Sequence, residues 1–432
     1  MHHHAYDAVC QATPPDRRGA DRDHAADAGT GGPPRRAALT LFSLALGTFA
    51  IGSGEFGTNG IVPLLARDLH TSVPTATAAV TAYAIGVVVG SPLITVAAAR
   101  LNRRSLLLGL MVLFIAGNLL SAAAPGIWAL IPFRFVTGTV QGAYFGAAAV
   151  VASTVYGRGR SGKAFATVMA GLTVAAIAGS PLGTWLGQHA GWPTLYWTVA
   201  GVGGLAWVAL ALWVPRSREL DGGSVTHELR ELRRGPVWVM VVVASAGISS
   251  IFAVYTFIGP FVTDAAGRPA SLIPVALAVF GVGMAVGNAV GGRVADRSRS
   301  LGLLVGFAVS VGLLVVIGLA GGSIRVLLPC LFGVGAFMML AVPTIQVRLT
   351  DAALDAPTLM GALNLASLNL ANSLGAIGGA VVLDAGGGTL STVWAGVALT
   401  SLALLVFLVA TPRRDHDRDR SPSSSTAVAA AS

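Results

Sequence analysis

Long apolar stretches separated by short polar connectors make up most of this chain. Stretches long enough to span a membrane lie near 38–64, 74–99, 104–124, 127–152, 164–188, 195–214, 237–263, 272–294, 302–320, 326–346, 359–383 and 390–411. About twenty apolar residues let a helix cross the roughly 30 Å hydrocarbon core of a bilayer, whereas β-barrel strands would give alternating segments of about ten residues. The pattern therefore predicts an all-α membrane protein with twelve transmembrane helices.

Polar segments flank this apolar region and divide it. Residues 1–36 and 413–432 are poor in apolar side chains, which predicts two disordered cytoplasmic tails. The longest internal polar break, 215–236, predicts a cytoplasmic linker between an N-terminal bundle at 37–214 and a C-terminal bundle at 237–412. We interpret these as two pseudo-symmetric six-helix bundles of the kind that parallel repeats produce.

A repeated spacing supports the division into two halves. Two glycines and an arginine of the second span recur in the eighth span at one constant offset: Gly86, Gly90 and Arg100 match Gly283, Gly287 and Arg297. We take this match as a sign of internal duplication.

Basic residues are distributed unevenly among the connectors. Those after even-numbered spans hold most of them, whereas those after odd-numbered spans hold only Arg67, Arg268 and Arg325. Arg and Lys collect in cytoplasmic loops, so both termini are predicted to be cytoplasmic. This placement also explains the net charge of +9 without a nucleic-acid partner, in a chain of which 54% is hydrophobic and 11% charged.

Glu55 is an acidic residue inside the first span, in the segment GSGEFGTNGIVP. A charged carboxylate there costs several kcal/mol unless it is paired or hydrated, so intramembrane acids are candidates for proton or substrate handling. The alternative is a structural carboxylate that accepts hydrogen bonds from helix amides near Gly57 and Gly60.

Arg134, in the fourth span, is the predicted cationic partner of Glu55. Counted at roughly 1.5 Å per residue from the span ends, both side chains lie about 10–14 Å below the outer surface. An ion pair would act as a switch if protonation of Glu55 released Arg134. The alternative is that Arg134 extends to the surface or binds helix carbonyls and has a structural role.

Other polar and aromatic groups within the spans are candidates for a substrate cavity. Gln141 and Phe145 share a helix face with Arg134, and Asn59 shares one with Glu55. The predicted cavity residues are Asn59, Tyr83, Gln141, Phe145, Tyr255, Asn364 and Asn369. Each of these side chains could instead hold two helices together, without contacting a substrate.

Two further motifs indicate conformational change. Gly171, Gly179 and Gly183 place small residues on one face of the fifth span beside Pro181, which predicts a close or moving helix contact. After the eighth span, Gly292, Asp296 and Arg297 are predicted to form a cytoplasmic latch, in which a carboxylate binds helix-end amides and arginines. The alternative for this loop is simple enrichment in cytoplasmic charge.

The sequence shows no Ser-His-Asp set, no metal-ligand spacing and no phosphate-binding glycine loop. We therefore expect neither an enzyme, nor a metal site, nor an ATP-driven pump. Cys10 lies in the tail and Cys330 in an apolar stretch, so no disulfide framework is indicated.

These motifs together resemble the major facilitator superfamily over residues 38–411. GGRVADR at 291–297 looks like its signature loop, whereas the first-half copy, TVAAARLNRR at 95–104, departs at Thr95 and Ala99. RFVTGTVQG at 134–142 is similar to the helix-four motif whose arginine is implicated in proton coupling. AGSPLGTWLG at 178–187 is similar to the helix-five motif of proton antiporters.

Two segments resemble one branch of that superfamily. GSGEFGTNGIVPLLARDL at 52–69 and the segment ALNLASLNLANSLGAIGGAVVLDAG at 362–386, in and just after the eleventh span, are similar to drug:proton antiporters that include chloramphenicol-resistance and arabinose (sugar) efflux proteins. Pro193 departs from this branch, which usually has an arginine there.

The resemblance implies a proton-coupled exporter of small organic molecules, with a chloramphenicol-like antibiotic as the expected substrate. Efflux of sugars or nucleosides, uptake, and a non-transporting membrane sensor remain alternatives. We expect no cofactor beyond the proton gradient, and a multi-pass monomer in the lipid bilayer of a bacterial plasma (inner) membrane.

Overall fold

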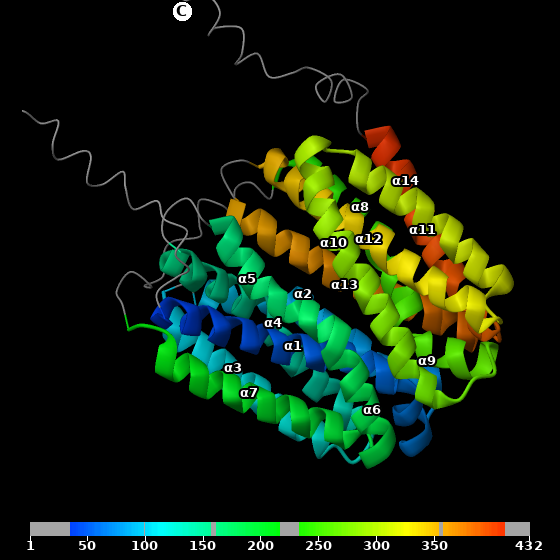
Figure 1. The fold of residues 1–432 in the computed structure, drawn as a ribbon, viewed down its shortest axis with the longest axis horizontal. Coiled ribbons are helices and arrows are strands. Elements are labelled where there is room, and N and C mark those ends of the chain that lie inside the picture. The colour runs from blue at the N-terminus through cyan, green and yellow to red at the C-terminus, as the bar shows by residue number, and fades with distance from the viewer. Residues whose placement is uncertain (1–34, 99, 157–160, 217–232, 354–356, 411–432) are drawn as a thin grey trace, which may run out of the picture.

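Helices make up most of the part that the computed structural model describes, residues 35–98, 100–156, 161–216, 233–353 and 357–410 (Figure 1). Within these ranges, twelve helices are long and apolar enough to cross a membrane, and no strand occurs. The predicted all-α class with twelve spans is confirmed. Most of the predicted tails and the central part of the linker lie outside the described residues, although the first helix already begins at Arg35.

The described residues of the first half of the chain form seven α-helices. They are α1 (Arg35–Asp68), α2 (Val73–Ala97), α3 (Arg103–Ala122), α4 (Ile127–Tyr156), α5 (Ser161–Val174), α6 (Ser180–Ala190) and α7 (Pro193–Trp213). The second half contains α8 (Gly235–Tyr255), the short α9 (Ile258–Pro260), α10 (Ile273–Arg297), α11 (Leu301–Ala320), α12 (Ile324–Ala352), α13 (Pro357–Asp384) and α14 (Thr392–Ala410).

Each half contains a π-helical turn beside a proline within the described residues. Helices α5 and α6 are joined by the turn Ala175–Gly179 and together form the fifth span. Pro181 lacks a backbone N–H, and the N–H of Ser180 bonds back to Ala175, which widens the turn. After the seventh span, which ends at Tyr255, Pro260 ends the short α9 and the π-helical turn Phe261–Ala265 follows.

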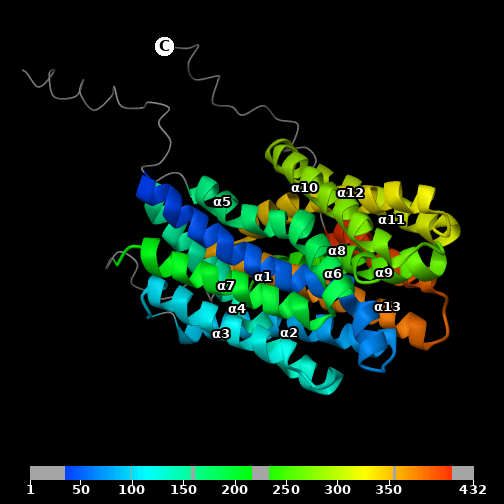
Figure 2. The ribbon, with the colours of Figure 1, turned by 60° about the horizontal axis from the view of Figure 1, so that its bottom comes forward.

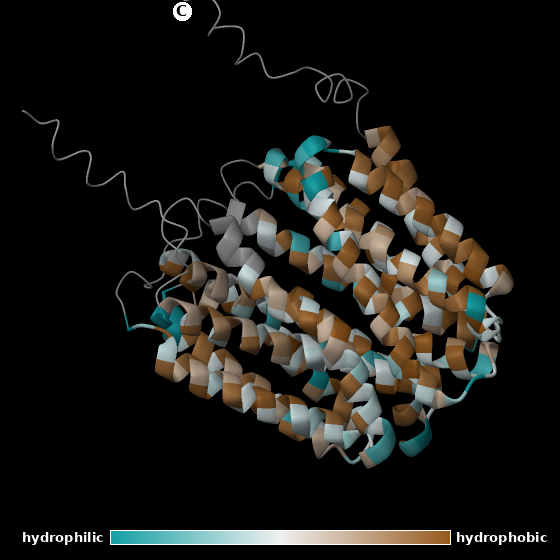
Figure 3. Ribbon diagram, in the orientation of Figure 1, coloured by the Kyte–Doolittle hydropathy of each residue, from teal (hydrophilic) through white to brown (hydrophobic). Residues whose placement is uncertain are grey.

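Each half buries its own apolar core. One buried cluster runs from Leu41 to Val214, and the other from Val237 to Phe407 with Phe56 as a member from α1. Helices α1–α7, coloured blue to green, lie beside α8–α14, coloured green to red, in both ribbon views (Figures 1 and 2). Apolar residues dominate the helices and polar ones gather at their ends (Figure 3), as expected for helices whose outer faces contact lipid.

The two halves repeat the same close helix packing. A Cβ atom on Gly86 would overlap the backbone of Phe135, where α2 crosses α4. A Cβ atom on Gly283 would likewise overlap Phe332, where α10 crosses α12. The partner residues are related by the same offset as the glycines, and Gly90 against Thr139 and Gly287 against Ala336 repeat the relation. Small residues thus allow the same backbone approach in both bundles.

The halves meet along α2 and α13, and along α10 with the fifth span. Gly281 of α10 lies so close to the fifth span that a Cβ atom would be 2.6 Å from the carbonyl oxygen of Ala176. At the predicted outer end, the Gln188 side-chain amide donates to the Ala270 carbonyl at 2.8 Å, which ties α6 to the segment before α10.

Candidate functional site

Glu55 lies on α1 at the junction of the two halves, with a residue exposure of 6%. Its Oε2 atom accepts a hydrogen bond of 2.8 Å from Nε2 of Gln141 on α4, in the same half. Its Oε1 atom accepts one of 3.5 Å from Nδ2 of Asn372 on α13, in the other half. The carboxyl group therefore connects the two bundles through two amide donors.

Arg134 is fully buried on α4. One guanidinium nitrogen donates to the carbonyl oxygen of Gly54 at 3.0 Å, and the other lies 3.4 Å from the hydroxyl of Thr137. The guanidinium carbon lies 4.4 Å from the ring centre of Tyr83 and 5.4 Å from that of Tyr196, close enough for cation–π attraction.

The sequence placed Glu55 and Arg134 at one depth, and the contact between Arg134 and the carbonyl just before Glu55 agrees with that. The expected ion pair, however, is not formed between these two described residues: Glu55 faces two amides, and Arg134 faces a helix carbonyl. The reason is competition, because the Gly54 carbonyl and two tyrosine rings hold the guanidinium in place. The contact of Arg134 with a helix carbonyl is the one expected if this residue has a structural role.

Asn59 and Tyr255 join the halves toward the predicted outer end. Asn59 donates to the backbone oxygen of Glu55 at 3.2 Å and accepts from Thr256 of the second half at 3.0 Å. The Tyr255 hydroxyl donates to Ser180 of α6 at 2.7 Å, while its ring meets that of Phe56 edge to face. Both residues therefore connect the bundles.

The remaining predicted cavity residues have varied surroundings. Tyr83 lies against Arg134, and its hydroxyl has no hydrogen-bond partner among the described residues. Phe145 packs in the first core next to Tyr144, so it supports the bundle. Asn364 donates to Gln346 at 2.8 Å, and Asn369 to the Leu365 carbonyl at 3.0 Å. Within the described part of the chain, Phe145, Asn364 and Asn369 form no hydrogen bond with Glu55.

Sequence reasoning missed Asn372, the residue through which the second half reaches Glu55. Asn372 follows Asn369 by three residues and Asn364 by eight, so helical spacing on α13 was a signal for it. Tyr196, Ser180 and Thr256 were missed as well, because aromatic and hydroxyl groups are common in membrane helices and give no distinct pattern.

Several buried polar atoms around this junction have no hydrogen-bond partner among the described residues. They include the side-chain oxygens of Tyr83, Gln141, Asn364, Asn369 and Asn372. A buried polar atom left unpaired costs about 1–3 kcal/mol, and such atoms in a native protein call for an explanation. Donors on a polar ligand would satisfy the amide oxygens.

The predicted glycine face of the fifth span packs tightly against α1. A Cβ atom on Gly171 would overlap the carbonyl of Ala45, and one on Gly179 would overlap the side chain of Ser53. A Cβ atom on Gly183 would crowd Leu195 of α7, and Pro181 lies next to the π-helical turn. The expected close contact is present.

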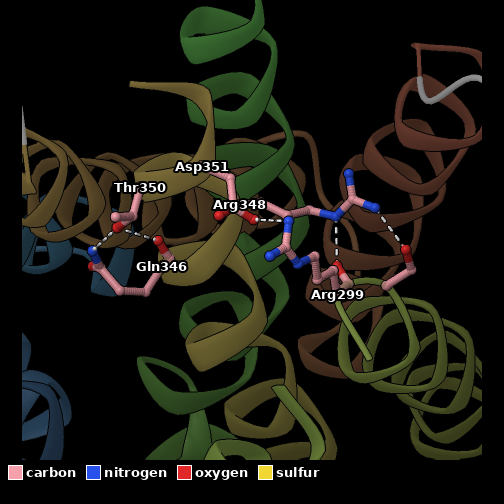
Figure 4. Close-up of polar contacts among 6 residues, drawn as sticks. Arg299, Gln346, Arg348, Thr350 and Asp351 are labelled. Carbon is pink, nitrogen blue, oxygen red and sulfur yellow. Dashed lines mark hydrogen bonds and ion pairs between the residues drawn. The ribbon is translucent and has the colours of Figure 1, made fainter. Parts of the chain in front are cut away.

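The latch predicted at the end of α10 differs from the contacts observed there. Asp296 and Arg297 are exposed, Gly292 has open space around it, and neither charged side chain forms an ion pair within the described ranges. Arg299 instead pairs with Asp351 of α12 at 2.9 Å (Figure 4). Asp296 points to solvent because it lies on the outer face of the last helical turn, whereas the following loop brings Arg299 to α12.

Arg348 reinforces the connection between this loop and α12. Its Nη2 atom donates to Ser300 at 2.6 Å, and its Nε atom donates to the carbonyl of Arg299 (Figure 4). Its guanidinium also lies 4.8 Å from the Phe407 ring centre. The loop after α10 is therefore fixed to the end of α12 by two arginines. Elsewhere in the described ranges, no group of His, Cys, Asp and Glu could hold a metal ion.

Comparison with known proteins places this architecture in a family. The sequence model of the Major Facilitator Superfamily matches residues 44–376. An inner membrane transport protein, YdhP of Escherichia coli O157:H7, is 37% identical over 85% of this chain and 94% of its own length. A chloramphenicol resistance protein of Streptomyces lividans is 32% identical over 85% of this chain and 95% of its own.

A solved structure shares the fold. The crystal structure of a bacterial homolog to the human lysosomal transporter Spinster superposes with a TM-score of 0.71 at 15% identity, over 91% of this chain and 100% of that one. With the family match across most of the spans, and with relatives named as transport proteins, the chain belongs to the major facilitator superfamily.

Proposed function

We propose that this chain is a proton-coupled secondary transporter that exports small organic molecules across a bacterial inner membrane, with both termini in the cytoplasm. The observation that carries the proposal is Glu55, a buried carboxyl group that accepts hydrogen bonds from both halves. The similarity to a chloramphenicol resistance protein makes a chloramphenicol-like drug the first substrate to test.

The two amides make the link between the halves sensitive to the proton on Glu55. An ionised carboxylate only accepts hydrogen bonds, and the side-chain nitrogens of Gln141 and Asn372 only donate them. A protonated carboxyl group presents one O–H donor and accepts more weakly than a carboxylate does, so its hydrogen bonds from the two amide nitrogens weaken. Loss of the longer hydrogen bond, from Asn372, would remove this link between α1 and α13 and allow the halves to move.

Arg134 supplies a fixed positive charge one peptide away from Glu55. When Glu55 gives up its proton, the buried site therefore contains one charge of each sign. In the outward-facing state Glu55 takes a proton as substrate leaves, and in the inward-facing state it releases the proton as substrate binds. The proton gradient thereby drives export around a site near the bilayer centre.

Purified protein in liposomes with an imposed proton gradient tests this proposal. The Glu55→Gln variant keeps the shape of the side chain but cannot ionise, so gradient-driven chloramphenicol flux should fall to that of protein-free liposomes. Chloramphenicol binding should persist. Asp384→Asn, a carboxylate exposed at the end of α13, is the matched control and should transport normally. Gradient-driven flux through Glu55→Gln at the wild-type rate would refute the coupling role.

Export of sugars or nucleosides is the second candidate. It is favoured by the amide oxygens of Asn364, Asn369 and Asn372 on α13, which have no hydrogen-bond partner among the described residues and suit ligands rich in hydroxyl groups. Competition against chloramphenicol flux by a panel of sugars and nucleosides separates the two. If no compound moves under the gradient while Glu55→Gln binds ligand as the wild type does, the sensor alternative holds instead.

A further inference from the structure

A cavity of about 900 Å³ lies at the end of the first bundle where α1 begins. Its lining comes from the first turns of α1 and α3 and from the last turns of α4 and α7, and it includes Arg36, Thr40, Arg104, Thr154, Trp213 and Arg216. Because this is the predicted cytoplasmic end of these helices, the cavity lies at the depth of the lipid headgroups on that side. None of the residues around Glu55 lines it.

Three arginines give this cavity a concentrated positive charge. Arg36 and Arg216 are exposed, and Arg104 is partly buried, with one nitrogen bonded to the carbonyl of Ala211. The Nε atom of Arg104 is buried and has no partner among the described residues. Within the same residues no carboxylate pairs with any of the three. Like charges that have no counter-ion among the described residues favour an anionic ligand.

Exposed apolar side chains continue from the cavity along the outside of the bundle. Leu39 and Phe42 lie one turn apart on α1, and Leu205, Val208 and Leu212 lie along one side of α7. The ring of Phe42 lies 6.5 Å from that of Trp213, so the two helices together present one apolar surface. An acyl chain would fit on such a surface, with its headgroup among the arginines.

We propose that this cavity binds an anionic phospholipid of the cytoplasmic leaflet, with its phosphate held by Arg36, Arg104 and Arg216. Basic pockets between transmembrane helices on the cytoplasmic side suit such headgroups. A free phosphate would use the same arginines but would leave the apolar surface of α1 and α7 unused. The site is independent of the substrate and of proton coupling, although it relies on the predicted orientation.

Quenching of Trp213 fluorescence by lipids with brominated acyl chains tests the proposal in nanodiscs. The Trp213 signal is the difference between the wild type and Trp213→Phe. Brominated phosphatidylglycerol should quench it at a lower mole fraction than brominated phosphatidylcholine. At about 1 kcal/mol for each arginine near the membrane surface, each arginine replaced by glutamine should reduce this preference about fivefold. The variant with all three arginines replaced by glutamine should lose the preference. If that variant does not fold, the double variant Arg36→Gln/Arg216→Gln replaces it in the test, because it keeps the hydrogen bond from Arg104 to the Ala211 carbonyl.

A matched control removes the same charge from the same end of the molecule. Arg100, Arg233 and Arg293 are exposed there and lie outside the cavity lining, so replacing them with glutamine should preserve the preference. The proposal would be overturned if the control variants lost the preference for phosphatidylglycerol as much as the cavity variants do, or if the wild type showed no such preference. It would also fail if glycerol phosphate in solution displaced the brominated lipid as well as short-chain phosphatidylglycerol does, because the acyl chains would then contribute nothing.

Discussion

The hydrogen bond between Tyr255 and Ser180 offers a direct test of what holds the outer ends of the two bundles together. Its O–O distance is 2.7 Å and both residues are buried. Replacing Tyr255 with phenylalanine removes only the hydroxyl, and Ser180 keeps its own donation to the Phe56 carbonyl at 3.1 Å. The expected cost is therefore that of one net hydrogen bond, about 1 kcal/mol.

That cost falls only on the conformation in which the outer ends touch. A change of about 1 kcal/mol alters a population ratio about fivefold, so the outer ends should separate correspondingly more often. Spin labels at His189 and Arg268, which are exposed at the predicted outer ends of different halves, would report the separation by electron–electron double resonance.

Tyr144→Phe is the matched control for this measurement. Its hydroxyl donates to the Leu44 carbonyl at 3.2 Å, a bond of the same kind that lies entirely within the first half. It should leave the distance distribution unchanged. The reasoning is refuted if Tyr255→Phe does not move the distribution, or if Tyr144→Phe moves it as far.

Two further predictions concern packing and the loop after α10. Gly171→Ala should lower the melting temperature in detergent sharply, because its Cβ atom meets the Ala45 carbonyl, whereas Gly201→Ala, at an open position, should change it little. Arg348→Gln should cost about 1.5–3 kcal/mol of unfolding free energy for its charged hydrogen bonds, and Arg299→Gln less than about 1 kcal/mol because that ion pair is largely exposed. Equal effects of the two glycine variants would contradict the close contact at Gly171. Equal effects of the two arginine variants would contradict the larger contribution of Arg348.

The spans were predictable because the requirement for a membrane helix is local. Length and hydropathy suffice, so even the interrupted fifth span was found, although its π-helical turn and the one after the seventh span were not. The common depth of Glu55 and Arg134 was also predictable, since it needs only the rise per residue.

The partners of these side chains could not be predicted in the same way. Which of several nearby groups a buried arginine binds depends on helix rotation and on neighbours from other spans. Tyr83 and Tyr196 come from α2 and α7, and the Gly54 carbonyl has no side-chain signal at all. Likewise, Arg299 pairs with Asp351 and not with the nearby Asp296, because tertiary packing brings the end of α12 to the loop.

The matched contacts of Gly86 with Phe135 and of Gly283 with Phe332 have a consequence for how polar side chains are divided between the halves. They align α4 with α12 residue by residue, and under that alignment Arg134 corresponds to Leu331 and Gln141 to Met338, both fully buried. The helix packing is thus the same in both halves, while the two α12 positions that correspond to Arg134 and Gln141 hold apolar side chains. At these two positions the buried guanidinium and the amide that contacts Glu55 therefore belong to the first bundle.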